Sequence, residues 1–139
     1  ERAAARLASL ASQLEERFGA AVVITSNAGG TSVELVPLVG ACPLYWVAFG
    51  DQLVLGVGRG ACRWELDGEN DDADFVEAVV EAVTAGRVSE VFSRARSEVT
   101  VRLADGTEAR TGAAEGLRGC VPVPRWTRRG PRVNYVAYG

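Results

Sequence analysis

The first eighteen residues place their apolar and charged positions with the period of a helix. Apolar side chains recur at intervals of three and four residues, which puts them on one side of a helix and leaves the charged residues elsewhere. These apolar positions are Leu7, Leu10, Leu14 and Phe18. The pattern predicts an amphipathic helix, and Gly19, at a place where glycine commonly ends helices, predicts where it stops.

Five short segments rich in β-branched and aromatic residues follow this helix, and each has the length and composition of a strand. They cover residues 21–26, 32–38, 44–49, 53–57 and 63–66. Turn residues separate them, such as the Asn27-Ala28-Gly29-Gly30 and Gly50-Asp51 stretches. Because the connections are short, consecutive strands should pair antiparallel, which predicts a meander.

The second half of the chain predicts one more helix and four more extended segments. An apolar stripe at helical spacing begins after the acids at 71–74 and stops before Gly86; its members are Phe75, Val76, Val79, Val80 and Val83. The extended segments are residues 88–92, 98–103, 107–111 and 133–138, and Asp105-Gly106 between the middle two is a strong hairpin signal. No repeat or linker divides the 139 residues. We expect one α+β domain, residues 1–139, with two helices packed on one face of a mostly antiparallel sheet.

The stretch LVLGVGRGACRWEL, residues 53–66, has a glycine at positions 56, 58 and 60 and resembles a nucleotide-binding loop only superficially. The third glycine of such a loop would fall on Ala61, and the residues after it alternate in the manner of a strand, with no helix to face a phosphate. We therefore expect Gly56–Gly60 to form strand and turn, with no helix starting at Ala61 and no anion bound by these amides. Interior glycines of this kind relieve a bulge or tight bend.

Composition narrows the chemistry further. All 15 basic residues are arginine, and lysine, histidine and methionine are absent, which indicates the codon bias of a high-GC bacterium. Without histidine or lysine the commonest acid–base, nucleophile-activating and Schiff-base mechanisms are excluded. A small carboxylate-dependent enzyme, with a pair of acids as in glycoside hydrolysis, is the remaining catalytic alternative, but nothing in the sequence places two acids across a cleft. We therefore expect no catalytic activity and no cofactor. The odd set of cysteines, with no C-x-x-C pair, predicts free thiols in the cytoplasm rather than a metal site; these are Cys42, Cys62 and Cys120. No apolar run is long enough to span a membrane.

Acidic residues cluster just before the predicted second helix. Six of them fall within ELDGENDDAD: Glu65, Asp67, Glu69, Asp71, Asp72 and Asp74. Counted from Asp67, the glycine position of a calcium loop holds Asp72 and its last ligand position holds Ala78, which excludes that motif. Acids at a helix start can cap it and complement its dipole. The excess over what capping needs also predicts a surface for a basic partner.

Arginines gather near the C-terminus, around a tryptophan. They are Arg118, Arg125, Arg128, Arg129 and Arg132, and Trp126 lies among them. Such a group can bind phosphate or RNA, or can pack by cation–π contact at the start of a strand. The net charge of −3 disfavours nucleic acid as a partner. We take Trp126, Arg128 and Arg129 as a second candidate partner-binding group, and we expect Trp46 and Trp64 to pack in the core or on a sheet face.

Three segments of residues 63–139 carry a resemblance to a known class of protein: FVEAVVEAVTAGRVSEVF, SEVTVRLADGTEARTG and VPVPRWTRRGPRVNYVAYG. With these segments the chain resembles small immunity-type proteins of high-GC bacterial polymorphic toxin systems. They contain a helix cap, a hairpin and a strand entry, so the resemblance assigns no active residue. It implies a small acidic protein that binds and neutralises a toxin, often a basic nuclease. The alternative is a secretion chaperone, which would expose the apolar stripe of the first helix to a client or a second subunit.

Overall fold

In the computed structural model the chain is described over residues 2–27, 32–37, 40–49, 52–60, 62–66, 70–93, 96–114 and 132–138. Two helices and nine strands occur in these ranges. Their order is α1 (Arg2–Phe18), β1 (Val22–Ser26), β2 (Ser32–Pro37), β3 (Leu44–Phe49), β4 (Gln52–Val57), β5 (Arg63–Leu66), α2 (Asn70–Thr84), β6 (Val88–Ser93), β7 (Arg96–Arg102), β8 (Glu108–Ala114) and β9 (Arg132–Asn134). The predicted α+β class is confirmed.

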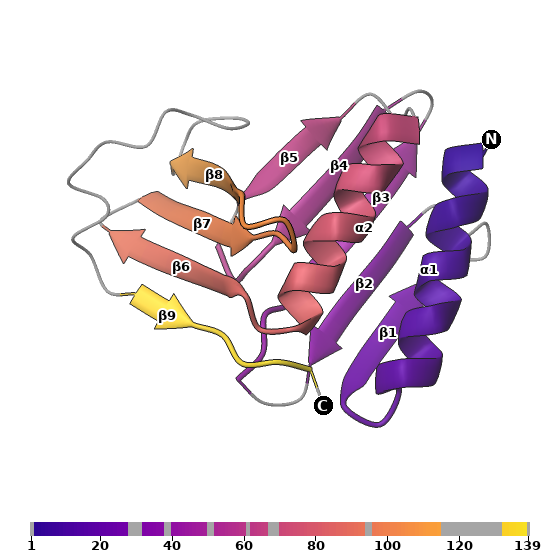
Figure 1. Cartoon of the computed structure of the whole chain (residues 1–139), viewed down its shortest axis with the longest axis horizontal. Helices are drawn as coiled ribbons and strands as arrows, with labels where there is room; N and C mark the ends of the chain where they lie inside the picture. The colour runs from indigo at the N-terminus through magenta and orange to yellow at the C-terminus, as the bar shows by residue number, and fades with distance from the viewer. Residues whose placement is uncertain are drawn as a thin grey trace.

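The strands divide into two antiparallel sheets. The first is the predicted meander, in the order β1-β2-β3-β4-β5, and the second has the order β8-β7-β6-β9. The strands of the two sheets run in different directions, with α2 as the connection between them (Figure 1). Edge strands β5 and β8 are linked where Thr111 Oγ1 donates a 2.7 Å hydrogen bond to the carbonyl oxygen of Arg63.

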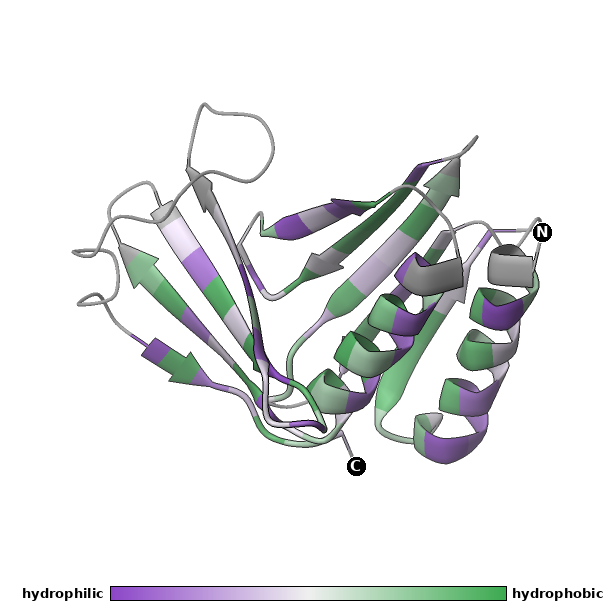
Figure 2. Cartoon of the chain, turned by 45° about the horizontal axis from the view of Figure 1, so that its top comes forward, coloured by the Kyte–Doolittle hydropathy of each residue, from purple (hydrophilic) through white to green (hydrophobic). Residues whose placement is uncertain are grey.

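Both helices lie on one face of the β1–β5 sheet, and the main core fills the space between them (Figure 1). Leu35, Trp46 and Leu55 point inward from neighbouring strands and are at most 1% exposed. Hydrophobic and hydrophilic positions alternate along both helices, as the helical period requires (Figure 2). The prediction that Trp46 lies in the core is confirmed, and Trp64 is half-buried with its ring edge-to-face against Phe75 at 5.4 Å.

Helix α2 ends as the sequence predicts. Gly86 has a φ of +82°, and the amides of Gly86 and Arg87 donate to the carbonyls of Val83 and Ala82. This left-handed turn is one that glycine adopts without strain. A side chain at this position would also meet the amide nitrogen of Ala137, because the C-terminal segment passes directly over the turn.

The C-terminal segment leaves its sheet earlier than the sequence predicts. Only Arg132–Asn134 pair with β6 as β9. After that the chain turns toward the end of α2, where the amide of Tyr138 donates to the carbonyl of Thr84 at 2.9 Å. The ring of Tyr138 contacts Phe18 of α1 edge-to-face. The Tyr135 amide still donates to the Val88 carbonyl oxygen of β6, and Val136 forms an isolated parallel bridge with Ala41, so single contacts stand where a continuous strand was expected over residues 135–138. Among the described helices, none has the length and apolar character needed to span a membrane.

Candidate functional site

The acidic residues predicted to bind a partner are only partly described. Glu65 is exposed on β5 and forms an ion pair with Arg63 at 3.0 Å. Asp72 and Asp74 lie in the first turns of α2, together with the backbone of Asp71. Asp67, Glu69 and the side chain of Asp71 lie outside the described residues.

Asp74 takes part in a contact between the two helices. The Arg6 guanidinium of α1 bonds to Asp74, and it also donates two hydrogen bonds to the Glu77 carboxylate, at 2.7 and 3.2 Å. These bonds, with the larger effect from Glu77, raise the pKa of Arg6 above its ordinary value. At least one of the predicted acids therefore has a role within the fold.

The second predicted group, Trp126, Arg128 and Arg129, lies outside the described ranges. Arg132, which follows it in the sequence, is described and lies on β9 at the edge of the second sheet. Arg132 lines the surface described below.

The glycine-rich stretch forms strand and turn, as predicted, but its amides do bind an anion. The carboxylate of Glu90 on β6 accepts two hydrogen bonds of 2.9 Å, one at Oε1 from the Arg59 amide and one at Oε2 from the Gly60 amide. Gly58 has a φ of +93°, and a side chain there would lie 2.5 Å from Glu90 Oε1. The expectation of no bound anion is therefore wrong, because the turn closes around a carboxylate of the same chain.

Glu90 is fully buried, and its remaining neighbours come from distant segments. Tyr135 donates a 2.6 Å hydrogen bond to it, and the Arg59 guanidinium lies over the Tyr135 ring. Burial raises the pKa of Tyr135, and the hydrogen bond to Glu90 raises it further. Burial, and then the charge of Glu90, raise the pKa of the Cys42 thiol. This cluster is closed, so we interpret it as structural.

The outer side of the β8-β7-β6-β9 sheet carries the open candidate site. Register partners Asn134, Ser89, Thr100 and Arg110 follow one another across the four strands. Two residues further along the hairpin, Arg102 pairs with Glu108. A depression of about 490 Å³ lies over this surface. We call it the arginine face, after the four arginines that line it: Arg87, Arg102, Arg110 and Arg132.

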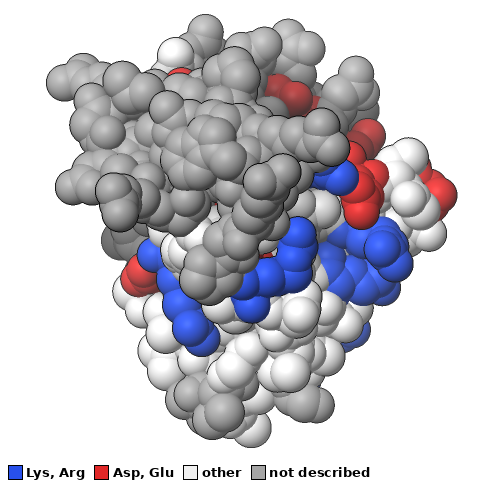
Figure 3. Space-filling model, turned by 90° about the vertical axis from the view of Figure 1, so that its left-hand side faces the viewer, with Lys and Arg blue, Asp and Glu red and all other residues white. Residues whose placement is uncertain are grey.

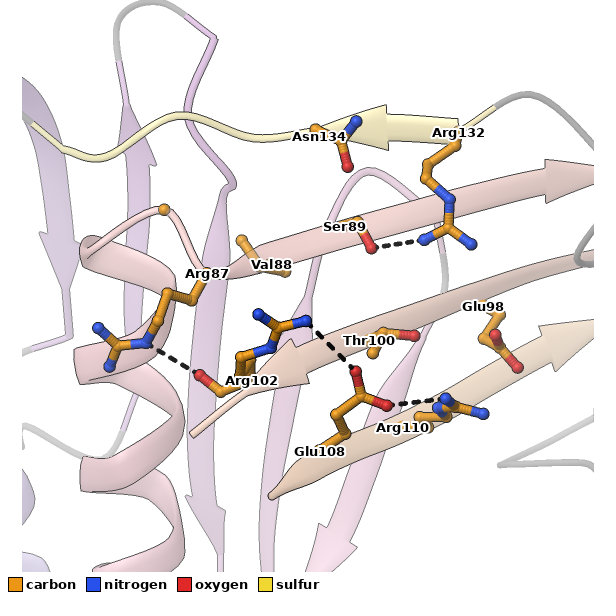
Figure 4. A pocket seen from close by; sticks show the side chains of 11 residues that line it. Arg87, Val88, Ser89, Glu98, Thr100, Arg102, Glu108, Arg110, Arg132 and Asn134 are labelled. Atoms are coloured by element: carbon orange, nitrogen blue, oxygen red, sulfur yellow. Dashed lines mark hydrogen bonds and ion pairs between the residues drawn. The ribbon is translucent and has the colours of Figure 1, made fainter. Parts of the chain in front are cut away.

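Short contacts hold the guanidinium groups of the arginine face in place (Figure 4). Arg110 bonds to Glu108 at 2.8 Å, and Arg102 lies 4.0 Å from the other oxygen of that carboxylate. Arg132 donates a 2.8 Å hydrogen bond to Ser89 Oγ. Arg87 donates a 3.0 Å hydrogen bond to the carbonyl oxygen of Arg102. Arg102 and Arg110 remain open to solvent, with side chains 67% and 45% exposed, whereas Arg87 also pairs with Glu81 at 3.5 Å and its Nη2 atom is buried.

Positive charge exceeds negative charge in this depression. Four arginines line it, against the two carboxylates of Glu98 and Glu108. Figure 3 shows arginine side chains gathered on the side of the molecule that this sheet forms. On a chain of net charge −3 the arginine face is a local positive field, which attracts anionic groups.

The hydroxyl group of Ser89 lies in the depression beside an arginine. A serine becomes a nucleophile when an adjacent base takes its proton. The neighbour of Ser89 is the Arg132 guanidinium, which donates to Ser89 Oγ and has no lone pair to accept a proton. Across the described ranges no three carboxylate or thiol groups gather as metal ligands. Four guanidinium groups around one depression suit the holding of an anion.

Sequence reasoning noted Arg132 among the C-terminal arginines but placed none of the four members of the arginine face in a candidate partner-binding group. The signal for two of them is present in the sequence: alternation on each side of the Asp105-Gly106 turn places Arg102 and Arg110 on the same face of a hairpin. Arg87 carries no such signal, because its position depends on how α2 ends.

The chain matches no protein-family model, no curated protein and no solved structure. The geometry of the arginine face therefore carries the functional argument.

Proposed function

We propose that this chain is a non-catalytic binding protein that docks a protein partner on its arginine face. The carrying observation is the group of four oriented arginines around an open depression on an acidic chain. Guanidinium groups pair with carboxylates in a planar and often bidentate geometry. An acidic segment of a partner protein is therefore the complement of this face.

In the setting that the resemblance implies, the partner is a bacterial toxin domain, and this chain is an immunity protein that neutralises it. The sequence favoured a basic toxin bound through the acids of residues 65–74. Ion pairs within the chain occur on both surfaces, at Glu65 and Asp74 among the acids and at Arg87, Arg102 and Arg110 among the arginines. The lining of the arginine face nevertheless has four guanidinium groups against two carboxylates. We therefore place the toxin contact at the arginine face, against an acidic segment.

A protein partner suits this face better than nucleic acid does. Proteins that bind single-stranded nucleic acid combine arginine with aromatic side chains on which bases stack. Among the described residues that line the depression there is no aromatic side chain. Charge pairing with carboxylates needs no such platform.

The position of α1 argues against the alternative of a secretion chaperone. That function needs an apolar helix stripe free for a client or a second subunit. Leu7 and Leu14 are each 3% exposed, and Leu10 and Phe18 pack against the same core. The apolar stripe of α1 therefore packs against the core of its own chain.

The proposal is tested by removing charge from the arginine face. Arg102→Gln and Arg110→Gln are made singly and together, with Arg17→Gln on α1 as a control for net charge. Each protein is used to capture partners from the native host, and captured proteins are identified by mass spectrometry. We expect a partner that the wild type and Arg17→Gln retain and that the double variant loses. With that partner purified, the double variant should associate at least about tenfold more slowly at low salt.

Two outcomes would contradict the proposal. One is a partner that all variants bind equally well, which would place the contact elsewhere. The other is capture of nucleic acid in place of protein. Thermal melting of each variant shows whether a loss of binding reflects a loss of fold.

A further inference from the structure

Most of the large apolar side chains that are exposed in the described ranges lie on the other sheet. The exposed ones are Val23, Val36, Tyr45 and Val136. The first three lie on the outer face of the β1–β5 sheet, because they alternate with residues that point into the core. Both helices cover the opposite face of this sheet (Figure 1). An uncovered apolar sheet face of this kind marks an interaction surface.

The centre of this face is shaped by a tyrosine lying over a glycine. A side-chain carbon placed on Gly56 would be 2.0 Å from the Tyr45 ring, so the ring occupies the space above that glycine. Val47 and Val54 are cross-strand partners beside it. A hollow of about 560 Å³ opens here; Tyr45, Val47, Val54, Arg63 and Glu65 are among the residues that line it.

Opposite charges stand at the two sides of this apolar centre. Glu34, Tyr45, Gly56 and Arg63 are register partners on β2, β3, β4 and β5, so they form one row across the sheet. Three strand spacings of about 4.8 Å separate the carboxylate end of the row from the guanidinium end. Reversing the strand order would therefore bring the acid of one row opposite the arginine of another.

We propose that this face binds a second copy of the same chain in a symmetric dimer. The two-fold axis runs parallel to the strands, between β3 and β4, and the two sheets pack face to face. Glu34 then lies opposite Arg63 of the second copy, and Val47 lies opposite Val54 of the second copy. Each such contact occurs twice, as the symmetry requires.

A second copy satisfies this face better than an unrelated partner of one charge. An acidic partner would complement Arg63 and repel Glu34, and a basic partner would do the reverse. The same chain supplies both charges with the apolar centre between them. The arginine face belongs to the other sheet, so the proposed dimer and the proposed partner contact use different residues.

The dimer is tested by sedimentation velocity from about 1 μM to about 1 mM protein, the range of reversible association. Wild type should move from monomer to dimer across this range. Glu34→Arg and Arg63→Glu should each weaken self-association at least about tenfold, because each sets like charges opposite one another. Arg110→Glu, on the other sheet, is the control and should dimerise as the wild type does.

Mixing the two deficient variants separates an interface effect from a folding defect. Arg63 also pairs with Glu65 in its own chain, so its reversal costs some fold stability. In an equimolar mixture of Glu34→Arg and Arg63→Glu, both cross-copy contacts regain opposite charges. We expect dimers to reappear in the mixture alone. A wild type that stays monomeric throughout, or a mixture that associates no better than its components, would overturn the proposal.

Discussion

The hydroxyl group of Tyr135 donates a 2.6 Å hydrogen bond to the carboxylate of Glu90, which is fully buried. The same carboxylate accepts hydrogen bonds from the amides of Arg59 and Gly60. One side chain of the second sheet thereby joins the C-terminal segment to the turn that connects β4 and β5. A buried carboxylate is costly unless donors replace its water, so each of these bonds should matter for stability.

Tyr135→Phe should destabilise the protein. The change keeps the ring in place and removes one donor from a buried carboxylate, which costs about 1–3 kcal/mol. Urea unfolding measures the loss in free energy of unfolding. Tyr45→Phe is the matched control, because that tyrosine is exposed on a sheet face and its change should stay within about 0.5 kcal/mol. Equal effects of the two changes would show that the Glu90 contact contributes nothing.

Gly58→Ala should cost more than Gly106→Ala. Both glycines have left-handed backbone, with φ values of +93° and +89°. Alanine in that conformation costs about 1–2 kcal/mol by itself. At Gly58 the new carbon would also lie 2.5 Å from Glu90 Oε1, whereas Gly106 has no atom within 4 Å of that position. We expect a difference of at least about 1 kcal/mol in unfolding free energy, since the carboxylate loses donors; equal losses would contradict the account of the turn.

Stability should fall at alkaline pH. Burial raises the pKa values of Tyr135 and Tyr138 above their ordinary value of 10.0. Below that value both the folded and the unfolded chain keep these protons, so the stabilisation is fully present. Above it the unfolded chain releases protons that the folded chain retains, and the free energy of unfolding therefore decreases as pH rises. Urea unfolding between about pH 9 and pH 12 measures this decrease.

The tyrosines can be assigned within that decrease. Tyr135→Phe should make the fall shallower, because the variant lacks one of the protons that the folded state holds. The absorbance of tyrosinate reports deprotonation of the tyrosines. In the folded protein, part of this absorbance should appear only when the pH is well above 10, the ordinary pKa of tyrosine. A free energy of unfolding that stays constant through the window would contradict the raised pKa values.

The pattern of apolar positions predicted most of the fold, because the spacing of apolar residues within a helix or strand indicates which side of that element is buried. Alternation in β2 and the three-to-four spacing in α1 reflect which side chain faces the core, and both are local properties. The division of the strands into two sheets is not local, since it depends on how α2 crosses from one sheet to the other. The early end of β9 has the same origin: the contacts of Tyr138 with Thr84 and Phe18 join residues far apart in sequence.

The functional residues were harder to predict than the fold. The sequence predicted a binding site at a continuous cluster of acids, but Asp74 of that cluster bonds to Arg6 of the other helix. The arginine face is discontinuous, built from the end of α2 and strands β7, β8 and β9. The sequence does contain a weak indication of the buried Glu90 cluster. Glu90 lies on the same inward side of β6 as Val88, at a position where an apolar residue is expected.

Charge reversal on the two candidate surfaces should separate them once the partner is purified. Under the proposed function Arg102→Glu with Arg110→Glu weakens binding and flattens its salt dependence, because those guanidinium groups attract the partner. Asp67→Arg with Glu69→Arg should leave the affinity within about twofold, or improve it slightly through long-range attraction of an acidic partner.

Asp72 and Asp74 are poorer probes, since they lie at the start of α2 and Asp74 bonds to Arg6, so their reversal changes the fold as well. Association rates are measured at two salt concentrations, and melting confirms that each variant folds. Suppose that Asp67→Arg with Glu69→Arg loses binding strongly and that Arg102→Glu with Arg110→Glu retains it. That result would place the contact on the acidic residues and indicate a basic partner.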